Sequence, residues 1–266
     1  MSTRAKDGIL AFFIYLSAFL TIGIMLAITG YILYNGLSAL RFNFFAELIP
    51  SIVTTLTVIV ISILFAVPVG IFAAIYLNEY AKNRKLVETV NFAIDSLAGI
   101  PSILYGLFGL VFFVTTMHMS WSILAGSLTL AIMILPTIIR VTQESLKMIP
   151  DGFREGSYAL GASKVITLGR IVIPSASRGI ITAVILSIGR IVGETAAVFL
   201  TVGTVDRMPT GVFSSGRTLS VHLYLLVKEA IGPEAFSEAF GTATLLILII
   251  LIIVIFTQVL FKGSKN

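Results

Sequence analysis

Four long stretches of the chain contain no Asp, Glu, Lys or Arg: Gly8–Leu40, Leu48–Asn78, Ser96–Ile139 and Ala239–Phe261. A helix needs about 20 apolar residues to cross the hydrocarbon core of a bilayer, and each stretch is longer than that. The composition agrees, since 57% of the residues are hydrophobic and 12% are charged, whereas in soluble domains about a quarter are charged. The pattern predicts an all-α, multi-pass membrane protein.

The four apolar stretches predict six membrane-spanning helices. Ser96–Ile139 is too long for one crossing, and its polar segment Met117–Trp121 contains a tryptophan, a residue that favours the membrane–water interface. We therefore expect a turn there, between a third and a fourth helix. The predicted spans are Ile9–Tyr34, Ser51–Tyr76, one on each side of this turn, Gly179–Val205 and Ala239–Phe261. No internal repeat or low-complexity segment divides residues 1–266, so we expect a single transmembrane domain.

The basic residues predict the orientation of the chain in the membrane. Six spans place both termini on one side, and Lys and Arg are concentrated on that side, as the positive-inside rule requires of a cytoplasmic face. Thirteen lie there and four lie on the other side, namely Arg4, Lys6, Lys82, Arg84, Lys85, Arg140, Lys147, Arg154, Lys164, Arg170, Arg178, Lys262 and Lys265 against Arg41, Arg207, Arg217 and Lys228. The pattern predicts cytoplasmic termini, a cytoplasmic loop at residues 150–174 and an external loop at residues 206–238. This spread also argues against a basic patch for nucleic acid, despite the net charge of +5.

The loop at residues 150–174 contains a spaced set of residues. Glu155 is followed by Gly161 six positions later, and the segment Ile171–Pro174 begins after nine further residues. This spacing resembles the EAA signature of permease subunits of binding-protein-dependent ABC importers, whose loop docks onto the ATPase. The chain departs from the signature at Gly156-Ser157, where two alanines are usual, and at Ile173, where leucine is usual.

A short helix in this loop would transmit movement between the membrane domain and an ATPase. Phe153, Tyr158 and Leu160 would offer bulky side chains to a pocket on the partner. Gly161 would permit a sharp turn, and Pro174 would mark the return toward the fifth helix, because proline breaks helical hydrogen bonding. The alternative is a polar loop whose helix is satisfied within the chain. The predicted coupling residues are Phe153, Glu155, Tyr158, Ala159, Leu160, Gly161 and Pro174.

Two charged residues, Arg190 and Glu194, lie inside the fifth apolar segment. Their i, i+4 spacing predicts that both side chains project from the same face of the helix. An Arg at mid-membrane costs about 2.5–3.5 kcal/mol on insertion scales, so such a residue is retained where it is paired or functional. Three interpretations stay open. The two residues form a structural ion pair, they meet charges on another subunit, or they line or gate a substrate path in which Arg190 offers a forked donor to an oxyanion.

Three segments carry a more specific resemblance. Gly189–Ala196 (GRIVGETA), Ala98–Gly106 (AGIPSILYG) and Tyr76–Ala81 (YLNEYA) resemble the PstA-type permease subunits of bacterial phosphate ABC importers, and the sister PstC type shares much of the pattern. The resemblance implies a MetI-like, type I fold with six transmembrane helices in the cytoplasmic (inner) membrane. It also implies a second, PstC-type permease, two ATPase subunits and a periplasmic or lipid-anchored phosphate-binding protein as partners.

Several chemistries have no counterpart in the sequence. It contains no Gly-x4-Gly-Lys-Ser/Thr loop for nucleotide phosphates, so we expect a partner to bind ATP and this chain to be neither an enzyme nor in need of a cofactor. His118 and His222 have no neighbours at metal-ligand spacing, so we expect no metal site. Two other functions remain possible at this point. One is a permease for sulfate, molybdate, phosphonate or another small oxyanion, and the other is a stand-alone secondary transporter or channel that needs no ATPase.

Overall fold

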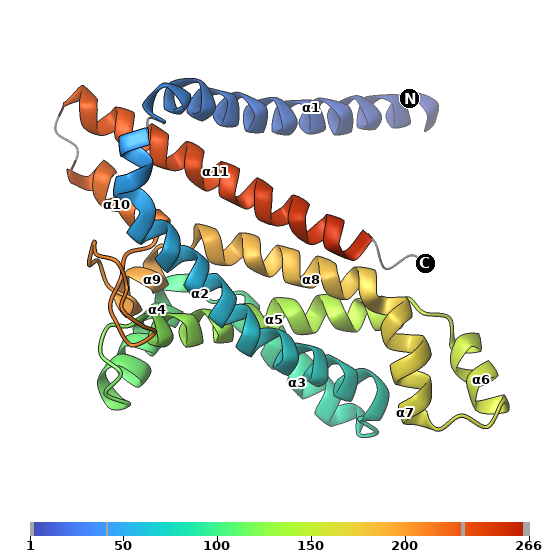
Figure 1. Ribbon diagram of the computed structural model, residues 1–266. Helices are drawn as coiled ribbons and strands as arrows, with labels where there is room; N and C mark the ends of the chain where they lie inside the picture. Colours follow the sequence, from blue (N-terminus) through green and yellow to red (C-terminus); the bar gives the residue numbers. More distant parts are fainter. Residues whose placement is uncertain (1–2, 41, 230–231, 263–266) are drawn as a thin grey trace.

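The computed structural model describes residues 3–40, 42–229 and 232–262, and all of their regular structure is helical (Figure 1). In chain order the elements are α1 Thr3–Gly36, η1 Leu37–Ala39, α2 Phe42–Ile75, η2 Tyr76–Tyr80, α3 Arg84–Ala98, α4 Ser102–Gly109, η3 Leu110–Thr116, α5 Ile123–Lys147, α6 Asp151–Ala159, α7 Lys164–Thr167, η4 Leu168–Val172, α8 Ile173–Gly193, α9 Ala196–Thr201, α10 Leu219–Glu229 and α11 Pro233–Lys262. Of the short elements, η1 is a 3-10 helix and η2, η3 and η4 are π-helices. The predicted all-α fold is confirmed.

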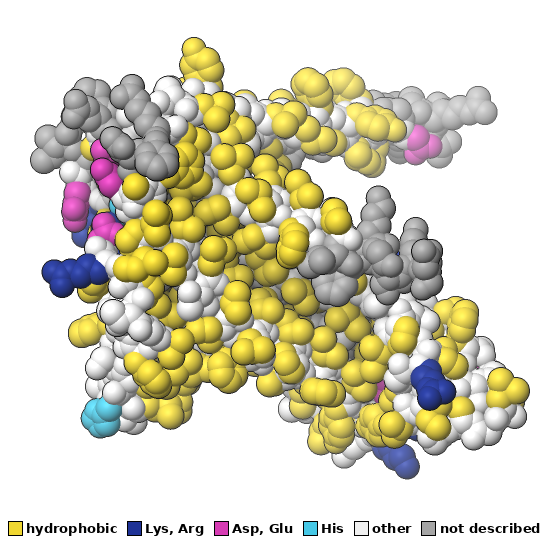
Figure 2. All heavy atoms as spheres, viewed as in Figure 1, with side chains coloured by type: hydrophobic (Ala, Val, Ile, Leu, Met, Phe, Trp, Pro, Cys, Tyr) yellow, Lys and Arg dark blue, Asp and Glu magenta, His cyan; other side chains and the backbone are white. Residues whose placement is uncertain are grey.

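Within the described residues, five helical segments are long and apolar enough to cross a membrane: Leu10–Ala39, Phe44–Tyr80, Ile123–Lys147, Lys164–Gly193 and Ala235–Val259. A sixth crossing is available only if the bent pair Arg84–Ala98 and Ser102–Thr116 is counted as one span. Hydrophobic side chains cover most of the visible flank, and charged side chains lie near its two ends (Figure 2). This distribution fits a bundle whose middle faces lipid.

α5 lies at the centre of the bundle. Most of its residues are buried, and it packs against α2, α4, α8 and α9. The largest hydrophobic core is built around it and includes Leu130, Ile134 and Ile138, all fully buried. α1 is the opposite case, because it is exposed along nearly its whole length and packs mainly against α11 (Figure 1).

The third predicted span is wrong in its form. α3 ends at Ala98, and the chain bends by 98° before α4 begins at Ser102. Pro101 lies in the break, where a proline removes a helical N–H donor and disfavours helical geometry in the residue before it. The turn predicted at Met117–Trp121 is confirmed, since η3 ends at Thr116 and His118 has a positive φ of 54°.

The fifth predicted span, Gly179–Val205, is also wrong at its end. The helix stops at Gly193, Glu194 has an extended ψ of 122°, and α9 begins separately at Ala196. The Glu194 carboxylate accepts a hydrogen bond from Ala197 N at 3.3 Å. It thereby satisfies one of the free N–H groups at the start of the new helix, which favours the break over continuation.

The two segments predicted as loops are largely helical. Residues 150–174 contain α6, α7, η4 and the first residues of α8, and residues 206–238 contain α10 and the start of α11. The start of α1, the end of α11 and α6 all lie toward the same end of the bundle (right in Figure 1). The termini and residues 150–174 therefore share a side. Of the basic residues counted above, Arg41 and Lys265 lie outside the described residues.

Candidate functional site

α6 projects from one end of the bundle as a short, separate helix (Figure 1). It begins at Asp151 after Pro150, and its last turn closes on Gly161. Gly161 N donates to Tyr158 O at 2.9 Å, and Ala162 N donates to Ser157 O at 3.1 Å. This pair of bonds is a Schellman motif, whose closing residue adopts a left-handed conformation.

Gly161 has a φ of +81°, which confirms the predicted sharp turn. A Cβ added at this position would meet no atom within 4 Å. The requirement for glycine therefore comes from the backbone conformation and not from lack of space.

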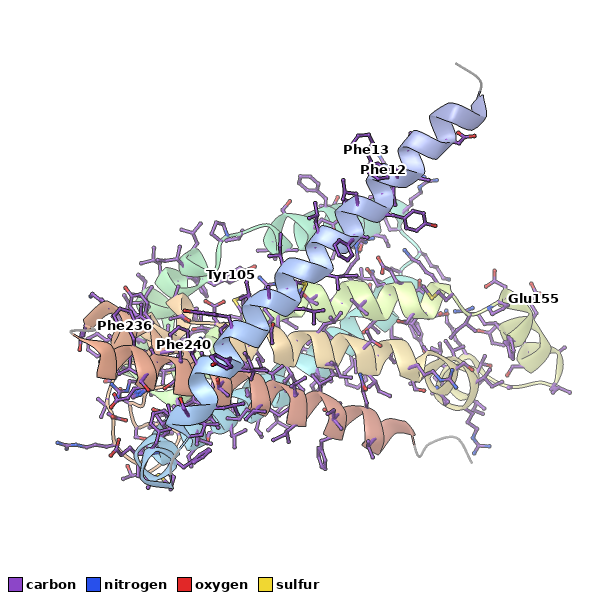
Figure 3. The ribbon with its side chains drawn as sticks, turned by 90° about the horizontal axis from the view of Figure 1, so that it is seen from above. Phe12, Phe13, Tyr105, Glu155, Phe236 and Phe240 are labelled. Atoms are coloured by element: carbon purple, nitrogen blue, oxygen red, sulfur yellow. The ribbon has the colours of Figure 1, made fainter. Side chains whose placement is uncertain are left out.

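The bulky side chains predicted as anchors are exposed. Phe153 is 55% exposed, Tyr158 43% and Leu160 90%, and Glu155 and Ala159 are also exposed. Glu155 lies at the outer part of α6, away from the bundle (Figure 3). A short helix that presents this much apolar surface beyond the spans has the character of a protein-docking site.

Pro174 marks the start of the fifth helix, α8, as predicted. The chain leaves α6 earlier, between Gly161 and Ser163, and is then helical from Lys164 to Gly193. Pro174 lies at the start of α8, directly after the π-helical segment η4. The wider π-helical turn accommodates a residue that donates no N–H and clashes with the preceding turn.

Arg190 and Glu194 do not form the predicted i, i+4 pair, because the helix ends between them. The half-buried Arg190 donates from Nη1 to Thr137 Oγ1 at 3.4 Å. Glu194 is turned toward α9, and its carbonyl oxygen accepts a hydrogen bond from Ser220 Oγ at 2.8 Å. Within the described ranges, no ion pair joins Arg190 to Glu194.

The two helix breaks belong to elements that touch. α4, which follows the break at Pro101, packs closely against α9, which follows the break at Glu194. A Cβ added at Gly106 would lie 2.8 Å from Ala197 Cα. Tyr105 Oη donates to Leu97 O at 2.8 Å and so bridges the first break. In secondary transporters, helices that are broken inside the membrane form the substrate site.

Two neighbouring cavities follow α9 from its first residue toward its end. One, of about 390 Å³, is lined by Ile103, Thr195, Ala196, Phe199, Leu200 and Tyr224. The other, of about 480 Å³, is lined by Ser120, Trp121, Phe199, Gly203, Thr204, Val205 and Ser215. Both contain hydroxyl groups and share Phe199. Sequence reasoning missed these residues, because single Ser, Thr and Tyr residues in apolar segments carry no signal of their own.

The two histidines differ in their burial. His118 is exposed, whereas His222 is half-buried. Burial is the main cause that lowers the pKa of His222 to about 4; the Arg217 charge adds to it and Asp206 opposes it. His222 is therefore neutral at physiological pH. The described part of the chain contains no group of three or more His, Cys, Asp or Glu placed to hold a metal ion.

Solved structures share this arrangement of helices. A chain of a bacterial alginate ABC transporter, crystallised with an alginate pentasaccharide-bound periplasmic protein, matches with a TM-score of 0.69 over 99% of this chain and 96% of its own, at 16% identity. A chain of the MetNI methionine ABC transporter matches with a TM-score of 0.64 over 82% of this chain and 94% of its own, at 19% identity. The fold is that of a MetI-like ABC importer permease.

The sequence comparison places the chain in a family. The model for "Binding-protein-dependent transport system inner membrane component" matches residues 66–263, well over half of the chain. The chain belongs to this family, which confirms the predicted ABC permease and the multi-pass membrane protein.

Relatives carry more specific names. "Phosphate transport system permease protein PstA" of Pasteurella multocida is 31% identical over 87% of this chain and 86% of its own length. "Probable ABC transporter permease protein YqgI" of Bacillus subtilis is 30% identical over 95% of this chain and 94% of its own. A PstA homolog of Mycoplasma pneumoniae is 38% identical over 78% of this chain, which spans only 34% of that longer protein. The resemblance to PstA-type permeases is confirmed.

Proposed function

We propose that this chain is the transmembrane permease subunit of an ATP-driven importer for inorganic phosphate. The observation that carries the ATP-driven part of the proposal is α6, a helix that closes on Gly161 and exposes Phe153, Tyr158 and Leu160 at the end of the bundle where both termini lie. The relatives named PstA support phosphate as the substrate. The chain itself catalyses no reaction and needs no cofactor, because partner subunits bind and hydrolyse ATP.

The proposed complex contains four kinds of subunit. Two ATPase subunits dock on the permeases, one of them on α6 of this chain, and a PstC-type permease completes the membrane domain. A periplasmic or lipid-anchored phosphate-binding protein delivers the substrate at the opposite end. The alginate transporter, which shares the fold, was crystallised with its substrate-bound periplasmic protein, and this supports a partner of the same kind here.

We assign the phosphate path to the region where α4 and α9 meet. Arg190 supplies the positive charge near this region, and its planar guanidinium suits an oxyanion better than a lysine would. The two cavities along α9 are mostly apolar and include the hydroxyl-bearing residues Thr195 and Tyr224 in one and Ser120, Thr204 and Ser215 in the other. Glu194 would repel an anion, so we assign it to holding the break open or to gating and not to phosphate binding. Arg190 or Glu194 also remains a candidate contact to the second permease.

The orientation part of the proposal places both termini and α6 in the cytoplasm and residues 206–218 outside. Because the chain has no cysteine, single cysteines introduced at Gly152 on α6 and at the exposed Gly211 report the side directly. In intact cells an impermeant thiol reagent should label Gly211→Cys and leave Gly152→Cys unlabelled until the membrane is permeabilised. Labelling with the opposite pattern refutes the orientation.

The docking part is tested by purifying the complex through a tag on this chain. The double variant Phe153→Ala/Leu160→Ala should insert normally and lose the ATPase, because two exposed apolar anchors are removed. Phe72→Ala is the matched control, since Phe72 is 71% exposed and lies within the α2 span, not on α6. Retention of the ATPase by the double variant would refute docking on α6.

A further inference from the structure

Arg154 ties α6 to the membrane domain. Its Nη2 donates to Glu79 Oε1 at 2.8 Å and to Leu146 O at 3.0 Å, and its Nη1 donates to Ile149 O at 2.9 Å. One guanidinium on α6 thus reaches the end of the α2 span and the end of α5. A second, longer contact of Nη1 joins Asp151 Oδ1 at 3.3 Å, within α6 itself.

The pair of Arg154 and Glu79 is buried. The side chains are 14% and 8% exposed, respectively. A buried charge pair is screened little by solvent, and removing one partner leaves the other uncompensated. A second ion pair of the same length, Arg84–Glu88 at 2.8 Å, has side chains that are 91% and 61% exposed, so it contributes little. The Arg154–Glu79 and Arg84–Glu88 ion pairs therefore differ in burial and not in distance.

Glu79 is held from several sides. Asn78 Nδ2 donates to Glu79 Oε1 at 2.9 Å. Lys164, the first residue of α7, donates to the carbonyl oxygen of Glu79, and its ammonium lies 4.5 Å from the centre of the Tyr80 ring. Glu79 also lies in η2, where the α2 span becomes π-helical, an irregularity that often marks functional positions. Glu79 therefore receives one contact from α6 and one from the start of α7.

No residue of α6 belongs to the buried hydrophobic cluster at this end of the bundle. This cluster consists of Ile75, Leu146, Ile149, Leu168, Val172 and Ala176. Along α6 only Arg154 and Ser157 are not exposed, and Ser157 Oγ bonds Thr167 Oγ1 at 2.8 Å. Besides the chain connections at its two ends, α6 is therefore held to the bundle by buried polar contacts, and the contacts of Arg154 lead to the end of the α2 span and to α5.

We propose that Arg154 and Glu79 are the positioning joint through which movement of α6 is transmitted to α2 and α5. The inference rests on the proposed docking of an ATPase on α6. In this proposal the exposed apolar side chains of α6 bind the ATPase. The buried guanidinium of Arg154 transmits a displacement of α6 to the two spans α2 and α5. A single planar fork with several donors is suited to this, because it fixes direction as well as distance.

The test is the number of phosphate ions transported per ATP hydrolysed, measured in vesicles that contain the whole complex. Arg154→Gln and Glu79→Gln should keep the ATPase bound and lower this ratio about tenfold, because each leaves a buried partner unpaired. Arg154→Lys keeps the charge but loses the fork, so its ratio should fall between those of Arg154→Gln and the parent. The double variant Glu79→Gln/Arg154→Gln should be no worse than either single variant, since both act through one contact. Arg84→Gln is the control and should leave the ratio unchanged.

Each contrary outcome overturns the proposal. An unchanged ratio in both single variants would show that the joint transmits nothing. Additive losses in the double variant would show that the two residues act separately. Loss of the ATPase, or absence of every variant, including Arg154→Lys, from the membrane, would assign the pair to docking or to folding. Failure of the underlying docking proposal is recognised separately, because the Phe153→Ala/Leu160→Ala variant would then retain the ATPase.

Discussion

The packing of α4 against α9 and the attachment of α6 are two opposite ways of joining a helix to this bundle. At the first, helices approach so closely that a Cβ at Gly106 would lie 2.8 Å from the backbone of α9. At the second, a Cβ at Gly156 would meet no atom within 4 Å, and the contacts are polar. In a membrane, where water does not drive helices together, close packing of small residues replaces hydrophobic burial. α6 lies beyond the spans, and its apolar side chains Phe153, Tyr158 and Leu160 are exposed.

The largest expected effect comes from filling the close contact. Gly106→Val should prevent stable folding, because backbone atoms of α9 cannot move aside as a flexible side chain would, and overpacking costs typically 1–3 kcal/mol or more. The measurement is the amount of monodisperse protein after detergent extraction, with its thermal midpoint. Normal yield and an unchanged midpoint would contradict the close packing of α4 on α9.

The next effect is expected at the end of α6. Gly161→Trp should insert normally but lose the ATPase and uptake, because a bulky residue is strained at a φ of +81°. Gly161→Asn is the control, since asparagine tolerates this conformation better, and it should retain most of the bound ATPase. Equal behaviour of the Trp and Asn variants would show that the backbone conformation of the turn is not what docking requires.

Substitution of Arg190 is expected to change assembly little but uptake strongly. Arg190→Gln should leave assembly intact and abolish uptake, because the charge near the two helix breaks is lost, and Arg190→Lys should fall between the two. The variant Glu194→Gln distinguishes the two roles considered for Glu194. Loss of assembly would indicate that Glu194 makes a contact that holds the complex together, and loss of uptake alone would indicate that it acts in gating. Parental uptake by Arg190→Gln would refute a role in the path.

The smallest effect is expected at Gly156 on α6, where an added Cβ would meet no atom within 4 Å. Gly156→Ala should leave the complex assembled and raise the stability of α6 slightly, since alanine favours a helix over glycine by roughly 0.5–1 kcal/mol. Hydrogen exchange of the α6 amides should slow accordingly. A loss of folding comparable to that of Gly106→Val would erase the contrast between the two joints.

Much of this architecture is predictable from the sequence, because the free energy of inserting a helix into a membrane depends on the residue composition of that segment. The long apolar runs identified the spans, Met117–Trp121 identified a turn, and the spacing from Glu155 to Gly161 identified the end of α6. The breaks at Pro101 and Glu194 were not predicted, because a broken helix and a continuous one have the same hydropathy. Their position depends on contacts distant in sequence, such as that of α4 with α9.

The candidate site was predictable only in part, for a related reason. The exposed residues of α6 could be predicted from a local sequence motif, since they lie within a few positions of one another. The joint beneath α6 pairs Arg154 with Glu79, 75 residues earlier, and no local pattern joins them. The prediction that Arg190 and Glu194 share one face of a helix was wrong, because it assumed that the helix continues past Gly193, where it ends.

The central claim, ATP-driven phosphate import through α6, is tested most directly by uptake of radiolabelled phosphate into vesicles that contain this chain with its PstC-type partner, the ATPase and the binding protein. We expect accumulation that requires ATP on the side bearing α6, that is not inhibited by sulfate or molybdate, and that disappears in the Phe153→Ala/Leu160→Ala variant. Phosphate accumulation without ATP or without the ATPase, or ATP-driven uptake of another oxyanion in place of phosphate, would contradict the account.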